Sequence, residues 1–380
     1  MSGINMDVHE AFTRWAIDQG IMIKGVKPHY FPQRGMGLMA STDLETGDVI
    51  LQVPIKALRK ASDIPSRFSK ALPQCPVHGL FALSLNSCTS APWQAVLPTK
   101  EDIRVSMPLL WDPEIQQLLP HTAKALLEKQ KTKTSSAWDA IRKAFPEPHI
   151  TQDEFIHNYL IVNSRTFYYL SPALKSSQRQ PRKDDRLALN PFADYLNHSS
   201  NPTCAADLSA TGYTIRASQS IKTGSEIFIS YGSHNNDFLL GEYGFILDDN
   251  ACDSVSLDPW ITPLLTPEHA ENLKEVGFLD NYVLDANGIC YRTQVVLRIL
   301  CLPLGRWRRF VNGSEDEEAA REAADEVLRG VLSAARRETM EMINRVGATD
   351  AGLTEQRKTL LRRWNQIAVL LGNELSRIEG

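Results

Sequence analysis

The residues that could do chemistry are concentrated between positions 187 and 245. An Asn-His pair, Asn197 and His198, follows a largely apolar run, and the apolar residues 227–229 lead to Tyr231 and Gly232. An amide, an imidazole and a phenol can each hydrogen-bond a polar ligand or orient a reacting group. Each also has an ordinary structural explanation, because a histidine after an apolar run is commonly a hydrogen-bonded core residue. A strand tyrosine, likewise, commonly packs with its hydroxyl bonded.

Two other arrangements that could do chemistry are disfavoured by their context. A serine hydrolase triad can be drawn from Ser164, His198 and Asp194, but the Gly-x-Ser-x-Gly turn that exposes such a serine does not occur. Gly35-Met36-Gly37 would let a ligand approach the backbone closely, although it also suits a simple tight turn. Because no third glycine and following helix are in register, it is not a dinucleotide-binding fingerprint.

The N-terminal elements that must position these residues can be read from apolar spacing. Val8, Phe12 and Trp15 have helical spacing, and Gly20 is a suitable C-terminal stop. Residues 38–40 and 49–51 predict two short hairpin-like strands joined by a turn at 45–48.

Helices are predicted for much of the remaining chain. Residues 121–133 and 136–145 each predict a helix, and Thr151 with Glu154 has the spacing of a capping box that starts another. That helix would deliver residues 163–167. The C-terminal third, from about Ser254, is predicted to be helical, with an apolar stripe expected in helix–helix packing: Leu361, Trp364, Ala368, Leu371, Leu375 and Ile378.

Composition limits the class of protein. The 380 residues are 43% hydrophobic and 23% charged, with a net charge of −4, so a globular chain without a general attraction to nucleic acid or anionic membranes is expected. Six scattered cysteines contain no Cys-x-x-Cys pair, which argues against a zinc site or a disulfide framework. The first twenty residues lack the continuous apolar core of a signal peptide. No stretch approaches the roughly 20 apolar residues of a membrane span.

Five motifs in one order resemble the SET domain family. Residues 35–54 resemble its opening strands, with Gly-x-Gly-Leu, a turn, Gly-Asp and Val-Pro. Residues 164–167 resemble its Ser-Arg-x-Phe, and residues 190–198 its Pro-x-x-Asp-x-x-Asn-His. Residues 229–232 resemble its Tyr-Gly, and residues 237–245 its closing Tyr-Gly-Phe. One departure is Arg34, which stands where relatives often have an acidic or polar residue.

The order of the segments resembles the Rubisco large-subunit methyltransferase-like class of that family. The resemblance implies an α+β fold, a SET-domain β-fold of several small sheets with a pseudo-knot, a helical insert and a helical C-terminal lobe. The expected segments are an N-terminal SET segment at 1–60, a helical insert at 61–170, a C-terminal SET segment at 171–250 and a helical substrate-binding-like lobe at 251–380. The lobe is expected to position a protein substrate without joining the chemistry.

The resemblance also implies an activity. It predicts an S-adenosylmethionine-dependent protein-lysine N-methyltransferase that acts on a non-histone protein by in-line methyl transfer to a deprotonated lysine amine. A protein-histidine N-methyltransferase of the same fold and a catalytically silent SET protein acting as a binding module are the alternatives. Phe167 favours lysine, because histidine-directed relatives tend to carry Asn there.

The role of each residue is implied by its place in the motifs. Tyr231 would be the catalytic residue. Cofactor contacts would come from Gly35, Met36, Arg165, Asn197, His198, Tyr231 and Phe245. The lysine channel would be lined by Ser164, Phe167, Asp194 and Tyr243. We expect no metal, a protein partner that carries the target lysine, no nucleic-acid or membrane partner, a monomer, and a cytoplasmic or nuclear location.

Overall fold

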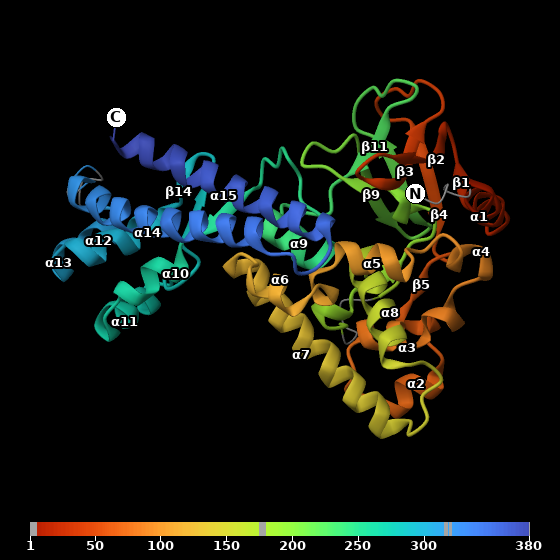
Figure 1. The fold of residues 1–380 in the computed structure, drawn as a ribbon. Coiled ribbons are helices and arrows are strands. Elements are labelled where there is room, and N and C mark those ends of the chain that lie inside the picture. The colour runs from red at the N-terminus through yellow and green to blue at the C-terminus, as the bar shows by residue number, and fades with distance from the viewer. Residues whose placement is uncertain (1–5, 175–179, 315–317, 319–320, 380) are drawn as a thin grey trace. The chain divides into compact units, whose positions relative to one another are not determined.

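The computed structural model describes residues 6–174, 180–314, 318 and 321–379 (Figure 1). The chain divides into two compact units. The first contains Met1–Arg104 and Glu128–Ser233, and the second contains Val105–Leu127 and His234–Gly380. The two units are defined by the density of contacts within each of them. The four segments expected from the sequence are a different division, which stays a prediction.

Three small sheets form the β-structure described in the first unit. The first has the order β1-β4-β10-β9, from Met22–Ile23, Val49–Pro54, Gly212–Ala217 and Cys204–Ser209. The second has the order β2-β3-β11-β8, from Val26–Phe31, Gly35–Ala40, Glu226–Ile229 and Asn197–His198. The third has the order β5-β7-β6, from Arg59–Lys60, Leu187–Leu189 and Thr166–Tyr168.

The predicted hairpin between the first two strands is wrong in its pairing. The turn at 45–48 is present, with Glu45 N donating to the Asp48 carboxylate at 2.9 Å. Yet β3 and β4 lie in different sheets. The connecting segment instead pairs across to another part of the chain, where Leu44 forms an isolated bridge with Ile221. Strand β3 forms a hairpin with the preceding strand β2 and pairs on its other edge with the distant β11, while β4 pairs with β1 and the distant β10.

Helices accompany these sheets. The first unit contains α1 (Met6–Asp18), α2 (Ser66–Ala71), α3 (Val77–Cys88), α4 (Ala91–Gln94), most of α5 (Lys100–Ser106), the later part of α7 (His121–Ala144) and α8 (Gln152–Arg165). The helix and stop predicted near the N-terminus are confirmed, with Phe12 buried and Gly20 at φ +85°. The predicted capping box is also confirmed, because Thr151 Oγ accepts from Glu154 N while the Glu154 carboxylate accepts from Thr151 N.

The two helices predicted at 121–133 and 136–145 are one continuous helix, α7. The polar residues between them do not interrupt it. The hydroxyl of Thr134 is buried and donates back to the carbonyl of Gln130 at 2.8 Å, so the side chain is satisfied within the helix. A threonine that bonds in this way stays helical.

The second unit is mainly helical but also holds a small sheet, which the sequence reading missed. Its helices are α6 (Pro113–Gln117), the first turns of α7, α9 (Asn236–Tyr243), α10 (Asp258–Ile261), α11 (Pro267–Glu275), α12 (Tyr291–Cys301), α13 (Leu304–Val311), α14 (Arg321–Ala348) and α15 (Thr354–Glu379). The sheet has the order β12-β13-β14, from Ser254–Ser256, Val283–Asp285 and Gly288–Ile289. The three strands have two or three residues each, too few for a clear alternating pattern.

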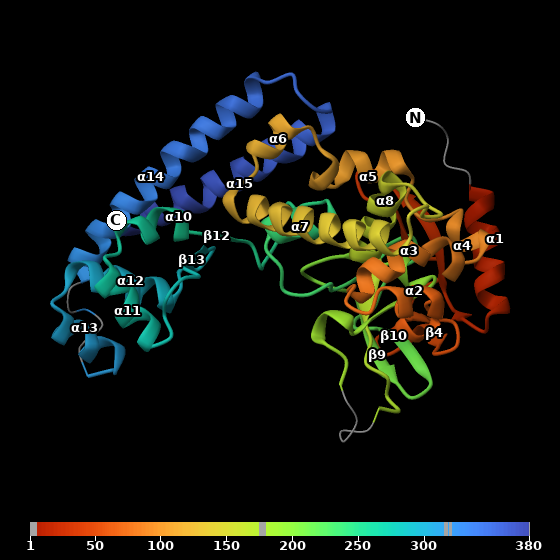
Figure 2. The same cartoon turned by 90° about the horizontal axis from the view of Figure 1, so that it is seen from below.

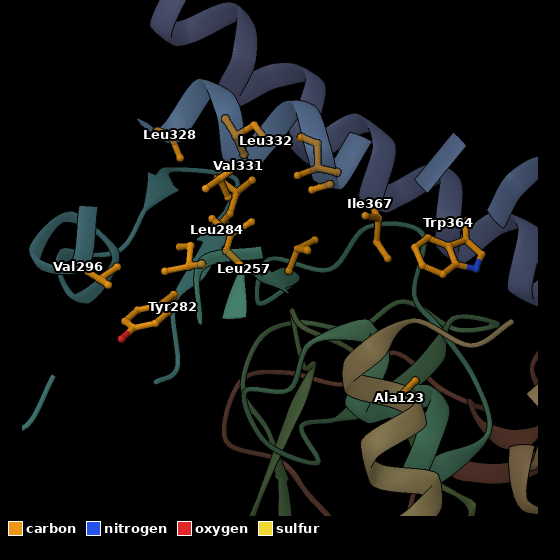
Figure 3. Close-up of a cluster of buried hydrophobic side chains, with 14 of the residues drawn as sticks. Ala123, Leu257, Tyr282, Leu284, Val296, Leu328, Val331, Leu332, Trp364 and Ile367 are labelled. Carbon is orange, nitrogen blue, oxygen red and sulfur yellow. The ribbon is translucent and has the colours of Figure 1, made fainter. Parts of the chain in front are cut away.

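Helices α14 and α15 lie side by side and cover this sheet (Figures 1 and 2). Figure 3 shows Trp364 and Ile367 of α15 and Val331 and Leu332 of α14 in one buried cluster with Leu284 of the sheet. The helix–helix packing predicted from the C-terminal stripe is thus confirmed for α15, where Trp364, Leu371 and Leu375 are buried. None of the helices in the described part of the chain is long and apolar enough to cross a membrane.

Candidate functional site

One sheet of the first unit brings together three of the predicted motifs. Strand β3 carries Gly35 and Met36, strand β8 is the pair Asn197 and His198, and Tyr231 follows the end of β11. Strand β11 pairs antiparallel with β3 and parallel with β8. Segments distant in the sequence therefore meet at the end of β11, where the candidate site lies.

Tyr231 is held on two sides. Its backbone N–H donates to His198 Nδ1 at 3.1 Å, and the same imidazole nitrogen lies 3.4 Å from the carbonyl oxygen of Ile229. The two rings stack with their centroids 5.1 Å apart. The Tyr231 hydroxyl donates to the carbonyl oxygen of Leu196 at 2.7 Å. The phenol is fixed in position, an arrangement that suits both a catalytic tyrosine and a strand tyrosine bonded to backbone.

The amide of Asn197 is fixed by two acceptors. Its Nδ2 donates to the carbonyl oxygen of Met36 at 3.2 Å and to Glu226 Oε1 at 2.8 Å. Because the Met36 carbonyl can only accept, the nitrogen of the Asn197 amide must face it, and Oδ1 lies on the other side of the amide group. Asn197 therefore ties β8 to β3 and presents an acceptor beside the Gly-x-Gly strand.

Glu226 is a site residue that the sequence reading missed. Its side chain is only 5% exposed, and Arg34 Nη1 approaches its second oxygen at 3.4 Å while the guanidinium lies over the Phe228 ring. Burial raises the pKa of Glu226, and the bond from Asn197 and the charge of Arg34 oppose this rise. The sequence did contain a signal for this residue. Glu226 is acidic in an otherwise apolar strand, and it shares a face of the strand with Phe228, because alternate residues of a strand point to the same side.

Gly37 allows this arrangement by its lack of a side chain. A Cβ at Gly37 would lie 2.8 Å from Glu226 Oε1 and 2.9 Å from Asn197 Nδ2. Gly35 has φ +81°, and a Cβ there would meet none of the described atoms within 4 Å. The first glycine leaves open space beside the strand, and the second leaves room for a hydrogen-bonded pair.

We predict that Gly37→Ala weakens cofactor binding by about five-fold, the equivalent of one displaced hydrogen bond at about 1 kcal/mol. The added methyl would push the Asn197 amide and the Glu226 carboxylate from their present places. Isothermal titration with S-adenosylmethionine measures the effect. Gly372→Ala, where a Cβ meets nothing within 4 Å, is the control. Unchanged affinity in the Gly37 variant would show that the position of the Asn197 amide does not matter for cofactor binding.

Arg165, the last residue of α8, is bonded to Asp194 through one nitrogen of its guanidinium group. Its Nη1 donates to the backbone carbonyl of Asp194 at 3.1 Å and lies 4.0 Å from the Asp194 carboxylate. Its Nε is buried, and the described residues offer it no hydrogen-bond partner. A guanidinium that is anchored by one nitrogen and has a second buried donor to spare is suited to binding an anion.

Asp194 lies at a strained turn. Phe192, two positions before Asp194, has φ +69°, an unusual value for a bulky residue, and its ring lies 6.1 Å from that of Phe12 and 5.4 Å from that of Tyr195. Burial raises the pKa of Asp194, and the Arg165 guanidinium opposes this rise. The carboxylate that the sequence reading assigned to the lysine channel is thus buried beside Arg165.

The remaining predicted channel residues are placed separately. The hydroxyl of Ser164 donates back to the carbonyl of Leu160 at 2.8 Å. The ring of Phe167 packs edge-on against Tyr213 at 5.8 Å. Since Ser164, His198 and Asp194 each have their own partners, the structure brings no hydrolase triad together. Within the described residues, no group of three or more His, Cys, Asp or Glu could hold a metal ion.

Tyr243 and Phe245 belong to the second unit. Tyr243 ends α9, Gly244 caps the helix with φ +80°, and the rings of Tyr243 and Phe245 lie 6.2 Å apart. Phe238 and His234 stack at 4.1 Å on the same segment. The closing motif is therefore a short aromatic cluster built on one helix and its cap.

Comparison with known proteins agrees with this geometry. The SET domain model matches residues 35–232, and the model of the ribosomal lysine N-methyltransferase 2 C-terminal domain matches residues 253–377. SET domain-containing protein 4 of Mus musculus is 27% identical over 379 residues, covering 91% of this chain and 85% of the relative. Ribosomal lysine N-methyltransferase set11 of Schizosaccharomyces pombe is 23% identical over 351 residues, covering 85% and 86%.

The fold is also that of a solved structure. The SET domain of LSMT, in a crystal structure bound to lysine and AdoHcy, superimposes with a TM-score of 0.63 at 18% identity, covering 99% of this chain and 92% of that one. The chain belongs to the SET domain family. Its fold is that of the Rubisco large-subunit methyltransferase structures, as the motifs predicted, and its C-terminal part matches the model of a ribosomal lysine N-methyltransferase C-terminal domain. The predicted fold class, a SET-domain fold of small sheets with a helical C-terminal region, is confirmed.

The residues present fit S-adenosylmethionine, the expected cofactor. This molecule carries a carboxylate, an ammonium and an adenine ring. The buried Nε of Arg165, which has no hydrogen-bond partner among the described residues, is a donor of the kind that a carboxylate requires. The open space at Gly35 and the Oδ1 of Asn197 provide room and an acceptor beside strand β3.

Proposed function

We propose that this protein is a protein-lysine N-methyltransferase that transfers a methyl group in line to a deprotonated lysine amine of a non-histone protein. The observation that carries the proposal is the meeting of three motifs at the end of β11, where Tyr231 lies beside the Gly-x-Gly strand β3 and the Asn-His strand β8 and is bonded to His198 and to the Leu196 carbonyl. By its place in the Tyr-Gly motif, this positioned phenol would be the catalytic tyrosine.

The cofactor would be held by residues of distinct chemistry. Arg165 would pair with its carboxylate, Gly35 and Met36 would contact it through their backbones, and Asn197 and His198 would contact its amino-acid and adenine ends. Phe245 would pack on the adenine. The chemistry that the cofactor supplies when bound is an electrophilic methyl group on a sulfonium.

The chain's own residues would prepare the nucleophile. A lysine amine has a pKa of about 10.4 in water, so it arrives as an ammonium. A narrow, water-poor channel penalises that charged form and lowers the pKa. Tyr231 would orient the neutral amine without adding charge, and Ser164, Phe167, Asp194 and Tyr243 would line the channel. Alignment of the two reactants contributes several kcal/mol of the acceleration.

Lysine is preferred to histidine because of Phe167. This position has no polar side chain to receive an imidazole, and the ring is fixed against Tyr213. The names of relatives such as the ribosomal lysine N-methyltransferase support the same choice. The match at 253–377 to a C-terminal domain of such an enzyme supports a protein substrate outside chromatin.

The organisation of the chain is proposed accordingly. The SET segments at 1–60 and 171–250 would carry the catalytic motifs, the segment at 61–170 would be a helical insert, and 251–380 would form a substrate-binding-like lobe. We expect a monomer in the cytoplasm or nucleus.

Methyl transfer into a lysate tests the function directly. Tritiated S-adenosylmethionine and the purified protein should label a protein of the source cell on lysine, identified by mass spectrometry. Label on histidine would overturn the lysine assignment. If a folded sample does not bind S-adenosylmethionine in isothermal titration, the enzyme assignment itself fails and the protein is a binding module.

A further inference from the structure

The second unit contains a fully buried arginine that none of the motifs includes. Arg363 of α15 is 0% exposed, and its Nε donates to Asp237 Oδ1 at 2.6 Å. Its Nη1 donates to Asp253 Oδ2 at 2.7 Å and its Nη2 to the carbonyl of Ser254 at 3.2 Å. Burial alone would raise the pKa of Asp237, and the Arg363 charge opposes this rise. Arg363 joins the C-terminal helix to α9 and to the start of β12.

A second set of hydrogen bonds joins the start of α9 to residues 246 and 247 and joins both to α15. Asn236 is buried, and its amide donates to the carbonyl of Leu247 at 2.9 Å and accepts from the Leu247 N–H at 3.0 Å. Gln366, one turn after Arg363 on α15, donates to the same Leu247 carbonyl at 2.8 Å and accepts from Asn236 at 3.0 Å. Arg362 donates to the carbonyl of Ile246 at 2.9 Å. Helix α9 and the turn that follows it to residue 247, here called the closing loop, are thus bonded to α15 at both ends.

On its other side, the closing loop packs closely against neighbouring residues at two glycines. A Cβ at Gly241 would lie 3.2 Å from the Leu126 side chain, so α9 packs closely on the first turns of α7. A Cβ at Gly244 would lie 2.8 Å from the Met107 sulfur and 2.9 Å from the Ser106 carbonyl oxygen. With α15 on one side and these contacts on the other, the segment that carries Tyr243 and Phe245 has little freedom to move.

We infer that Arg363 and Gln366 are positioning residues for methyl transfer, which set the place of Tyr243 and Phe245 through the closing loop. The inference rests on the proposed function, in which those two aromatic residues contact the lysine channel and the adenine. It differs from the sequence expectation that the C-terminal lobe takes no part in the chemistry. The lobe's last helix would act through the closing motif, in addition to any contact with the substrate protein.

The size of the effect follows from the sensitivity of aligned reactants to displacement. A misplacement of about 1 Å can lower a rate by on the order of a hundred-fold. Replacement of Arg363 alone would leave two carboxylates buried without a counter-charge, which destabilises the fold. A neutral set, Arg363→Met with Asp237→Asn and Asp253→Asn, removes the directed bonds without leaving a buried charge. Gln366→Leu is a milder single change that removes the bonds to Asn236 and Leu247.

The control is a second ion pair on the same helix. Arg377 of α15 donates to Glu374 at 2.7 Å and to the Asn287 carbonyl at 2.7 Å, so it joins α15 to the β13–β14 turn and not to α9. Arg377→Met with Glu374→Gln should therefore change stability without changing cofactor affinity or rate. Arg363→Lys, which keeps the charge, should restore part of the lost rate.

Cofactor affinity, single-turnover rate and melting temperature are measured on each folded full-length variant. We expect Gln366→Leu and the neutral set to lose roughly ten-fold or more in rate, while the control keeps the wild-type rate. Wild-type rate and affinity in folded Gln366→Leu would overturn the inference, whether or not the neutral set folds. If the wild-type protein itself neither binds S-adenosylmethionine nor transfers methyl, the proposed function fails instead.

Discussion

Tyr231→Phe is expected to lower the single-turnover rate of methyl transfer by on the order of a hundred-fold, the equivalent of about 2.7 kcal/mol of transition-state stabilisation. The change keeps the ring and its stacking on His198 and removes only the hydroxyl. The backbone bond from Tyr231 to His198 is independent of the hydroxyl, so the end of β11 should stay in place. Cofactor affinity should therefore survive while the amine loses its orientation.

The structure makes the competing explanation specific. If the hydroxyl serves only its bond to the Leu196 carbonyl, its loss costs about 1 kcal/mol of folding stability and leaves the rate per folded molecule unchanged. Tyr282→Phe is a matched control, because this buried tyrosine accepts from the backbone N–H of Asp280 at 3.1 Å and belongs to the other unit. It should show the stability loss alone. A Tyr231 variant that behaves like the Tyr282 variant would end the catalytic assignment.

What the sequence could predict depended on local information. The capping box at Thr151 and Glu154 and the helix stop at Gly20 are each set by residues a few positions apart, and each of the five motifs is likewise a short run of residues. Motif positions also gave the candidate residues that strands β3, β8 and β11 then bring together, although their roles stay predictions.

What could not be predicted depends on pairing across long separations. Glu226 looks like an ordinary strand residue until β11 is placed between β3 and β8, where its carboxylate meets Asn197. Arg363 stands beside Leu361 and Trp364 of the apolar stripe, and no acidic residue within a helical turn of it in the sequence indicates a partner. Its burial follows from Asp237 and Asp253, which lie more than a hundred positions earlier. A side chain's charge is visible in the sequence, but its partner is not.

Arg165→Ala is expected to raise the dissociation constant for S-adenosylmethionine by ten-fold or more. A hydrogen bond to a charged group contributes about 1.5–3 kcal/mol, and about 1.4 kcal/mol corresponds to ten-fold in affinity. The structure gives the reason, because Nη1 is anchored on the Asp194 carbonyl while the buried Nε lacks a partner in the described part of the chain. Isothermal titration measures the change.

The same change has a second consequence that the experiment must separate. Without Arg165, the rise that burial causes in the pKa of Asp194 loses its largest opposing cause, and a buried carboxylate without its cation destabilises the fold near neutral pH. Because the folded-state pKa is raised, this penalty is absent below the pKa of the unfolded chain and grows as the pH rises towards the folded value. Arg165→Ala with Asp194→Asn removes that penalty and should melt at a higher temperature than Arg165→Ala at neutral pH. If cofactor affinity recovers together with stability in the double variant, the guanidinium serves only the fold. If affinity stays ten-fold weaker while stability recovers, Arg165 holds the cofactor.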